Sequence, residues 1–121
     1  MEAILDTNFI VSCIRKNIDF LSQLESEGFK VKLPREVYQE LKDLRLKVGH
    51  DERLAVDLAL TMLTNKKVKK TTLGHTTVDA GLIALGKKGA YIATLDAAIK
   101  REVPNKIFIR ASQNGLEIQR A

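Results

Sequence analysis

Four acidic residues of this chain are spaced so that folding could gather them for metal chemistry. Asp6 and Asp96 each end a short apolar run and are followed by a helix-like stretch. In α/β proteins the carboxyl ends of the strands converge on the ligand crevice, so both acids are expected there. Glu40 and Asp79 lie on otherwise apolar helix faces, and we expect them to join the same cluster.

A cluster of four carboxylates predicts a divalent metal. Like charges raise each other's pKa values and repel one another unless cations neutralise them. Mg²⁺ and Mn²⁺ are hard cations that prefer oxygen ligands. Two such ions suit phosphodiester hydrolysis, because one generates the nucleophile while the second stabilises the leaving oxygen. The acids therefore indicate hydrolysis of a phosphodiester bond.

Each acid also has an ordinary structural explanation. Asp6 and Asp96 can cap the helices that follow them, and Thr76 with Asp79 matches a capping box. Glu40 lies on the inward stripe of its helix, where a Lys or Arg partner would satisfy it without a metal. One shared site explains all four acids together, whereas the ordinary explanations need a separate cause for each.

Length and composition indicate one globular domain over residues 1–121. The 121 residues are enough for a single core, and 45% hydrophobic with 29% charged residues is a globular composition. No apolar run approaches the about 20 residues of a membrane span, and no signal peptide is apparent. The single cysteine, Cys13, excludes an intrachain disulfide and a cysteine zinc cluster, so we expect a cytoplasmic location.

The net charge of +5 is unevenly distributed along the chain. Residues 1–60 carry 9 Lys and Arg against 11 Asp and Glu, whereas residues 61–121 carry 11 against 4. A basic body around a small acidic pocket suits a polyanion such as a nucleic acid, held through its phosphates, with charge that only aids solubility as the alternative. Lys100 and Arg101 follow Asp96 closely and are the candidates for phosphate contacts. The run Lys66–Lys70 is interpreted as a solvated face, with phosphate binding as its alternative.

The pattern of apolar residues predicts strands that alternate with helices. Strands are expected at Ala3–Asp6, Phe29–Leu33, Lys66–Leu73, Tyr91–Leu95 and Lys106–Arg110, with Gly115–Gln119 as an edge hairpin. Helices are expected at Thr7–Lys16, from Ile18 to a stop at Gly28, from Pro34 to near Gly49, from a cap at Asp51 to Thr64, at Thr76–Leu85 and before Pro104. This alternation is typical of an α/β three-layer sandwich with a mostly parallel sheet of four to five strands and helices on both faces.

The sequence contexts of the four acids resemble the PIN domain, a small metal-dependent ribonuclease fold. The opening Ile4-Leu5-Asp6-Thr7-Asn8 is similar to the first motif of the family, and Val37-Tyr38-Gln39-Glu40-Leu41 is similar to the second. Asp79-Ala80-Gly81-Leu82-Ile83-Ala84 is close to the third, one position different in its Ala, and Thr94-Leu95-Asp96 resembles the fourth. The resemblance covers essentially the whole chain, with the acids in the family's order.

The resemblance implies a metal-dependent endoribonuclease. Its ligands for Mg²⁺ or Mn²⁺ would be Asp6, Glu40, Asp79 and Asp96. Asn8 and Thr94 would support that site by hydrogen bonding. The short form is similar to archaeal PIN proteins, which are related to ribosome-biogenesis nucleases that process rRNA or to toxins of toxin–antitoxin pairs. RNA is therefore the implied substrate, and a second copy of the chain, an antitoxin or a ribosome-biogenesis factor are the implied protein partners.

Two other interpretations stay open. The first is a catalytically silent module of the same fold that binds RNA or a protein, against which the intact acid set argues. The second is a receiver-like phosphoacceptor domain, which also uses strand-end aspartates and Mg²⁺. Such a domain needs adjacent acids after the first strand, whereas Asp6 is followed by Thr7 and Asn8.

Overall fold

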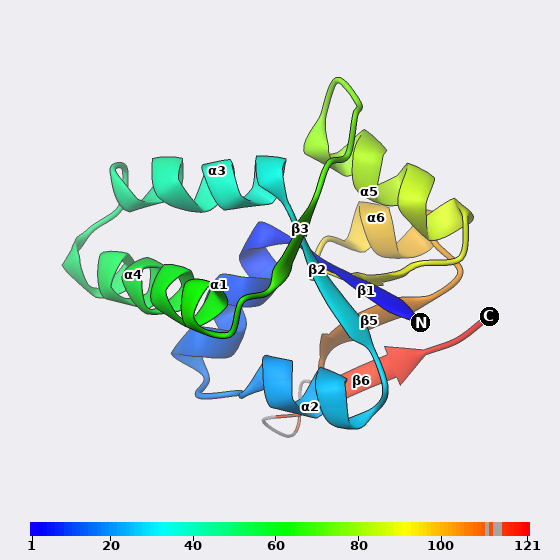
Figure 1. Cartoon of the computed structure of the whole chain (residues 1–121), viewed down its shortest axis with the longest axis horizontal. Helices are drawn as coiled ribbons and strands as arrows, with labels where there is room; N and C mark the ends of the chain where they lie inside the picture. The colour runs from blue at the N-terminus through cyan, green and yellow to red at the C-terminus, as the bar shows by residue number, and fades with distance from the viewer. Residues whose placement is uncertain (111, 113–114) are drawn as a thin grey trace.

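In a computed structural model that describes residues 1–110, 112 and 115–121, the strands form one mostly parallel sheet (Figure 1). Within these residues the sheet has six strands, in the order β3-β2-β1-β4-β5-β6. The strands are β1 (Glu2–Leu5), β2 (Lys30–Pro34), β3 (Lys69–Thr71), β4 (Tyr91–Ala93), β5 (Lys106–Ile109) and β6 (Leu116–Gln119). Only β6 runs antiparallel, beside β5.

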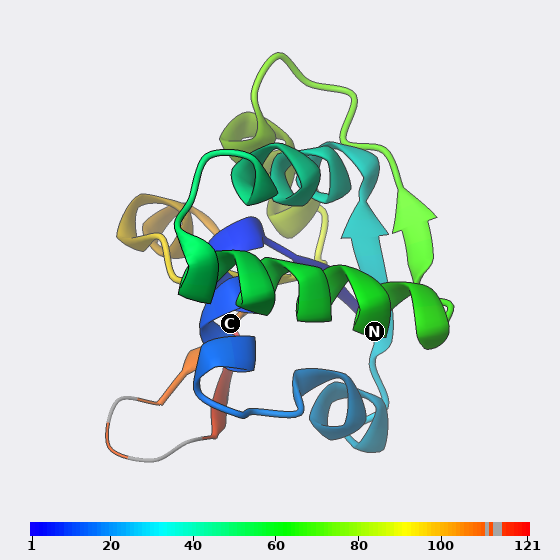
Figure 2. The same cartoon turned by 90° about the vertical axis from the view of Figure 1, so that its left-hand side faces the viewer.

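Helices cover both faces of the sheet. They are α1 (Thr7–Arg15), α2 (Phe20–Ser26), α3 (Arg35–Arg45), α4 (His50–Asn65), α5 (Val78–Lys87) and α6 (Ala97–Glu102). Successive side chains of a strand point to opposite faces, so Leu5 packs in the core formed with α1–α4 while Ile4 packs with α5 and α6. Figure 2 looks onto the first of these faces and shows α4 running across it beside α3.

The predicted α/β sandwich with helices on both faces is confirmed, but the sheet has six strands within the described residues rather than four to five. The additional strands lie at its two edges. Residues Lys69–Thr71 of the predicted segment Lys66–Leu73 pair with β2, and β6 pairs antiparallel with β5 as the expected hairpin. Both edge strands are short, so their pairing is decided by the neighbouring strand rather than by their own apolar pattern. None of the described helices is long and apolar enough to cross a membrane.

Several helix boundaries differ from the predicted ones, among them both ends of α3 and the cap of α4. Pro34 does not open α3 but ends β2, with extended dihedral angles of φ −61° and ψ 139°. The cap of α4 is Gly49 instead of Asp51, which lies in the first turn, where its negative charge favours the helix dipole. Helix α3 ends at Arg45, so a short turn separates it from α4.

The strand order reverses between β1 and β4, and this reversal defines the crevice. After β1 the chain adds β2 and β3 on one side, and then returns so that β4 pairs with the other side of β1. Connections leave such a point in opposite directions, which opens a crevice at the carboxyl ends of the two strands. Asp6 directly follows β1, and Asp96 lies three residues after the end of β4, so the topology delivers both acids to the crevice.

Helix α5 packs against its neighbours at very short range because it contains two glycines. A Cβ atom at Gly81 would lie 2.6 Å from Leu73 Cβ, and one at Gly86 would lie 2.4 Å from Val103 Cγ1. Any larger residue would push α5 outward, together with Asp79 in its first turn. The position of this acid therefore depends on glycine at the helix contact.

We expect Gly86→Ala to lower the free energy of unfolding by about 1–3 kcal/mol, because the new methyl group overlaps Val103. The direction of the change is informative, because helix propensity alone would make alanine more stabilising than glycine by about 1 kcal/mol. A loss of stability must therefore come from the overlap with Val103. Urea unfolding measures the change. Gly115→Ala is the matched control, because a Cβ there meets nothing within 4 Å. An equally stable Gly86→Ala protein would contradict the close packing of α5.

Candidate active site

One cavity at the carboxyl ends of β1 and β4 is lined by all four acids singled out in the sequence. Its volume is about 460 Å³. The lining comes from the first turns of α1 and α5, the cap of α6, and α3 with the turn after it: Asp6, Thr7, Asn8, Glu40, Asp43, Leu44, Lys47, Asp79 and Asp96. Segments separated by up to 90 residues thus present carboxylates to one space.

Asp6 is the buried acid of this cavity, with 8% of its surface exposed. Its Oδ1 accepts a hydrogen bond from the Thr7 amide at 2.8 Å, and its Oδ2 accepts one from Thr94 Oγ1 at 2.8 Å. Burial raises the pKa of Asp6, and the charges of Glu40 and Asp79 raise it further, while the two hydrogen bonds lower it without cancelling the rise. Asp6 is therefore held in place at an electrostatic cost that a cation would offset.

Thr94 connects the two strand-end acids. It is fully buried, and its hydroxyl donates to Asp6 Oδ2 while accepting the amide of Asp96 at 3.1 Å. Asp96 in turn caps α6, because its Oδ1 accepts the amides of Ala98 at 2.8 Å and Ile99 at 3.2 Å. Asp6 and Asp96 can thus cap their helices and share one site at the same time. Each accepts the capping hydrogen bonds through Oδ1, and both side chains still line the cavity.

Glu40 and Asp79 are exposed, so the prediction that both lie on buried helix faces is wrong. Glu40 lies at the border of the buried face of α3, and no ion pair to it is found among the described residues. Its Oε1 instead accepts from Thr7 Oγ1 at 2.5 Å. Asp79 precedes the apolar part of α5 and takes no part in the predicted capping box, because Thr77 rather than Thr76 caps the helix.

Three lining residues were not predicted. Asp43 and Lys47 follow Glu40 by three and seven residues, which is helical spacing and would have placed them on the same face. Thr7 was not recognised as a link between Asp6 and Glu40, although it directly follows the strand-end acid. Asn8 lines the cavity, but it makes no hydrogen bond within the described part of the chain that would support the site as expected.

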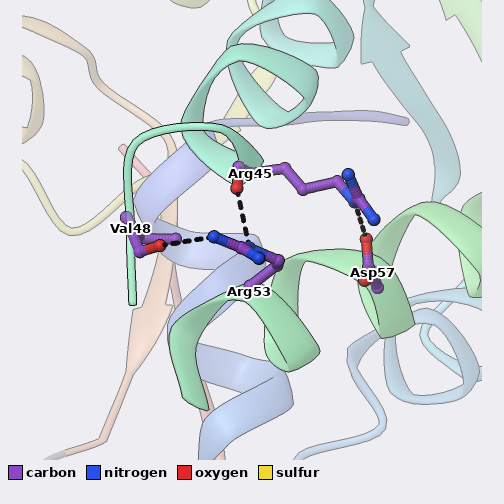
Figure 3. A network of polar contacts seen from close by, with 4 residues as sticks. All are labelled: Arg45, Val48, Arg53 and Asp57. Atoms are coloured by element: carbon purple, nitrogen blue, oxygen red, sulfur yellow. Dashed lines mark hydrogen bonds and ion pairs between the residues drawn. The ribbon is translucent and has the colours of Figure 1, made fainter. Parts of the chain in front are cut away.

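The turn that carries Lys47 is held by arginine side chains (Figure 3). Arg53 Nε donates to the carbonyl oxygen of Arg45 at 3.2 Å, and Arg53 Nη2 donates to that of Val48 at 3.3 Å. The guanidinium of Arg45 forms an ion pair with Asp57 of α4. These contacts join both ends of the turn to α4 and so keep Lys47, the one cationic lining residue among those described, beside the carboxylates.

Lys100 and Arg101 lie outside this cavity. They line a separate hollow of about 320 Å³ along α6, together with Lys106 and Phe108. Lys100 Nζ lies 4.7 Å from the centre of the Phe108 ring, and Lys106 Nζ donates to the carbonyl oxygen of Lys100 at 2.7 Å. Ala97, which directly follows the acid Asp96 in the chain, also lines this hollow.

Comparison with solved structures identifies the architecture. The structure of the PIN domain endonuclease Utp24 superimposes with a TM-score of 0.77 over 99% of this chain and 92% of that chain, at 20% sequence identity. The chain has the PIN fold. No family model and no curated protein sequence matches it. At this identity the likeness establishes the fold, and the chemistry of the site has to be argued from the residues of this chain.

The lining of this PIN-fold cavity suits a hard divalent cation. Most of its polar side chains are carboxylates, and the pKa of Asp6 is raised mainly by burial and further by the charges of Glu40 and Asp79. Among the described residues, no three His, Cys, Asp or Glu side chains are arranged as a ready-made metal site. Glu40 and Asp79 are exposed and can change rotamer without disturbing the core, so an ion at Asp6 could draw them inward.

We expect Thr94→Val to weaken Mn²⁺ binding by about 10–100-fold, since groups that orient a metal ligand typically contribute that much. The free energy of unfolding should also fall by about 1–3 kcal/mol, because the amide of Asp96 and Oδ2 of Asp6 lose their partner. Calorimetric titration and urea unfolding measure the two effects. Thr94→Ser keeps the hydroxyl and should restore both, whereas unchanged Mn²⁺ affinity in a folded Thr94→Val protein would contradict this role.

We expect Asp6→Asn to raise the Tm of the metal-free protein at pH 7. The folded-state pKa of Asp6 is raised, so its stabilising contribution exists below the ordinary pKa of 3.8 and is lost as the pH rises through the folded value. The gain from Asp6→Asn should therefore vanish toward about pH 3 and grow toward about pH 7. Thermal unfolding in EDTA across this range checks it, with the exposed Asp51→Asn as a control of opposite sign, since it removes a favourable helix-dipole charge and should lower the Tm slightly at pH 7. A lower Tm for Asp6→Asn at pH 7 would contradict the electrostatic account.

Proposed function

We propose that this chain is an endoribonuclease that depends on Mg²⁺ or Mn²⁺. The observation that carries the proposal is the gathering of four carboxylates, from four separate segments, into one cavity at the strand-order reversal of a PIN fold. The solved neighbour is an endonuclease, and the proposal extends that class of activity to this chain. The side chains that would hold the metal are those of Asp6, Glu40, Asp79 and Asp96.

The metal would supply Lewis-acid stabilisation of the reacting phosphate and lower the pKa of the attacking water. The chain positions the ligands. Backbone and hydroxyl donors fix both oxygens of Asp6, and the Thr94 hydroxyl ties Asp6 to the segment that carries Asp96. Thr7 holds Glu40 toward the cavity, and Lys47 provides a positive charge at its wall that suits a phosphate oxygen.

The substrate class follows from the charge outside the cavity. The chain carries a net charge of +5 although its candidate site is acidic. An anionic polymer is therefore attracted to the protein surface outside the cavity, and it is repelled only by the carboxylates, whose charge a bound metal would offset. The hollow with Lys100, Arg101 and Lys106 lies along α6, whose cap Asp96 lines the cavity, and offers cationic contacts for a phosphate. These features support RNA held mainly by its phosphates.

The test is cleavage of a labelled single-stranded RNA with Mn²⁺ or Mg²⁺ and with EDTA. We expect cleavage only with the metal, and a loss of at least about a hundredfold in rate for Asp6→Asn and for Asp96→Asn, since each removes a charged ligand. Asp51→Asn changes charge equally outside the cavity and should cleave as the unaltered protein does.

Full activity of Asp6→Asn or Asp96→Asn would refute the assignment. A folded protein that binds RNA but cleaves none of a broad set of RNAs with either metal would instead favour the silent binding module. That outcome would agree with the lack, within the described residues, of a ready-made three-ligand site.

A further inference from the structure

Six lysines surround the β3 edge of the sheet, away from the carboxylate cavity. This lysine belt comprises Lys30, Lys32, Lys66, Lys67, Lys69 and Lys70. Five of its members line a hollow of about 360 Å³ at the beginning of β2 and β3, together with Glu2 and Glu25. Lys67 and Lys70 line a second hollow of about 370 Å³ beside Tyr38. No residue of either hollow lines the carboxylate cavity.

The position of β3 explains why the belt spans two hollows. Neighbouring side chains in a strand point to opposite faces, so Lys69 lines the first hollow and Lys70 lines the second. In the described sheet β3 is the outermost strand and pairs only with β2, which leaves both lysines exposed. Lys67, in the turn before β3, lines both hollows and joins them into one surface.

The positive charge of the belt is poorly compensated by the chain. Among the described residues, Lys32 is the one belt lysine that forms an ion pair, with Glu2. Lys66 acts on the more distant Asp19, whose pKa is lowered mainly by its hydrogen bonds with Ser22. Mutual repulsion of neighbouring ammonium groups costs free energy, which a bound polyanion would remove.

Lys67 occupies a backbone conformation that disfavours lysine. Its φ is +52°, in the left-handed region, and it follows the cap of α4. Its amide donates to Thr64 O and the next amide donates to Leu63 O, which is the helix ending that normally takes glycine. A side chain there costs roughly 1–2 kcal/mol, against about 0.3–1 kcal/mol gained by a cation near a helix carboxyl end. The strain exceeds the gain from the helix dipole, so glycine would be more stable at this position and the lysine lowers the stability of the fold.

Lys70 of the second hollow and Lys42 of α3 are ordered by the same aromatic ring. Lys70 Nζ lies 4.1 Å and Lys42 Nζ 4.8 Å from the centre of the Tyr38 ring. Such contacts hold the ammonium groups in place and lower the entropy lost when they bind an anion. Because the ring already carries two cations, it suits recognition of charge rather than stacking of a base.

We propose that the lysine belt is a second RNA-binding surface, which holds the phosphate backbone of the substrate outside the cleavage site. The identity of the polyanion as RNA rests on the proposed function. The competing explanation is that edge lysines only prevent pairing of β3 with another sheet. That explanation requires charge at Lys69 and Lys70 in the strand, but it does not require a lysine in the strained turn at Lys67.

The test measures RNA binding in EDTA, so that no cleavage intervenes. Fluorescence anisotropy with a labelled single-stranded RNA over a series of KCl concentrations gives the slope of log K against log [salt]. Replacement of Lys67, Lys69 and Lys70 by Gln should reduce the magnitude of this slope by about 2, which is roughly a hundredfold weaker binding near about 0.1 M salt. The control replaces three exposed lysines outside the belt, Lys16, Lys87 and Lys88, by Gln. Equal slopes and affinities for the two triple variants would overturn the proposal.

Lys67→Gly separates binding from edge protection, because it lies outside β3 and favours the native turn. We expect RNA binding about fivefold weaker near about 0.1 M salt, for the loss of one phosphate contact, with a Tm equal to or above that of the unaltered protein. If Lys67→Gly binds RNA as tightly as the unaltered protein, the proposal is overturned. Self-association of the triple variant would not rescue it, because loss of edge protection at Lys69 and Lys70 explains self-association without RNA binding.

The outcome is independent of catalysis. If the unaltered protein cleaves no RNA but the belt variants bind it more weakly than the control, the proposed nuclease function fails and the belt stands. If the unaltered protein cleaves RNA and the belt variants bind as the control does, the nuclease function stands and the belt fails.

Discussion

The burial of Asp6 where the strand order reverses is the constraint on which the rest of the site depends. A carboxylate there loses hydration and faces two further acids, so its pKa is raised. The chain limits this cost with local donors, the amide of Thr7 and the hydroxyl of Thr94, rather than with a Lys or Arg. Donors of this kind fix the orientation of the carboxylate without neutralising it. The remaining charge is available to a metal, which an internal ion pair would have excluded.

The acids Glu40 and Asp96 of the cavity are also held through threonines. Thr7 contacts Asp6 through its amide and Glu40 through its hydroxyl, whereas the Thr94 hydroxyl contacts both Asp6 and the amide of Asp96, so two threonines connect β1, β4, α3 and the start of α6. A hydroxyl can both donate and accept, which lets one buried threonine serve an acid and an amide together. Positioning is therefore strongest at the strand ends and weakest at Glu40 and Asp79, which are exposed. The cavity therefore combines carboxylates that are fixed at the strand ends with two exposed carboxylates, Glu40 and Asp79, that have more freedom to move.

Much of this arrangement is predictable from the sequence. Alternating apolar patterns locate the strands and helices, and the rule that ligands bind where strand order reverses brings Asp6 and Asp96 together. Whether Glu40 and Asp79 are buried or exposed is not predictable from such patterns. A helical pattern defines a broad stripe, and whether a residue at its border is covered depends on the tertiary neighbours. Strands are predicted at both edges and are found there, but the bounds of β3 within the predicted Lys66–Leu73 depend on its partner strand β2.

Helix α3 lies between the second lysine hollow and the carboxylate cavity, and it would constrain the path of an RNA that used both. Tyr38 lines the second lysine hollow, whereas Glu40, two residues later, lines the carboxylate cavity. Two residues turn an α-helix by about 200°, so the two surfaces lie on nearly opposite faces of α3. A polyanion that contacts both must bend around this helix. A duplex is stiff on the scale of a single helix, while an unpaired strand can bend freely. If both surfaces act on one molecule, the geometry selects a flexible single-stranded segment for the cavity and excludes a straight duplex.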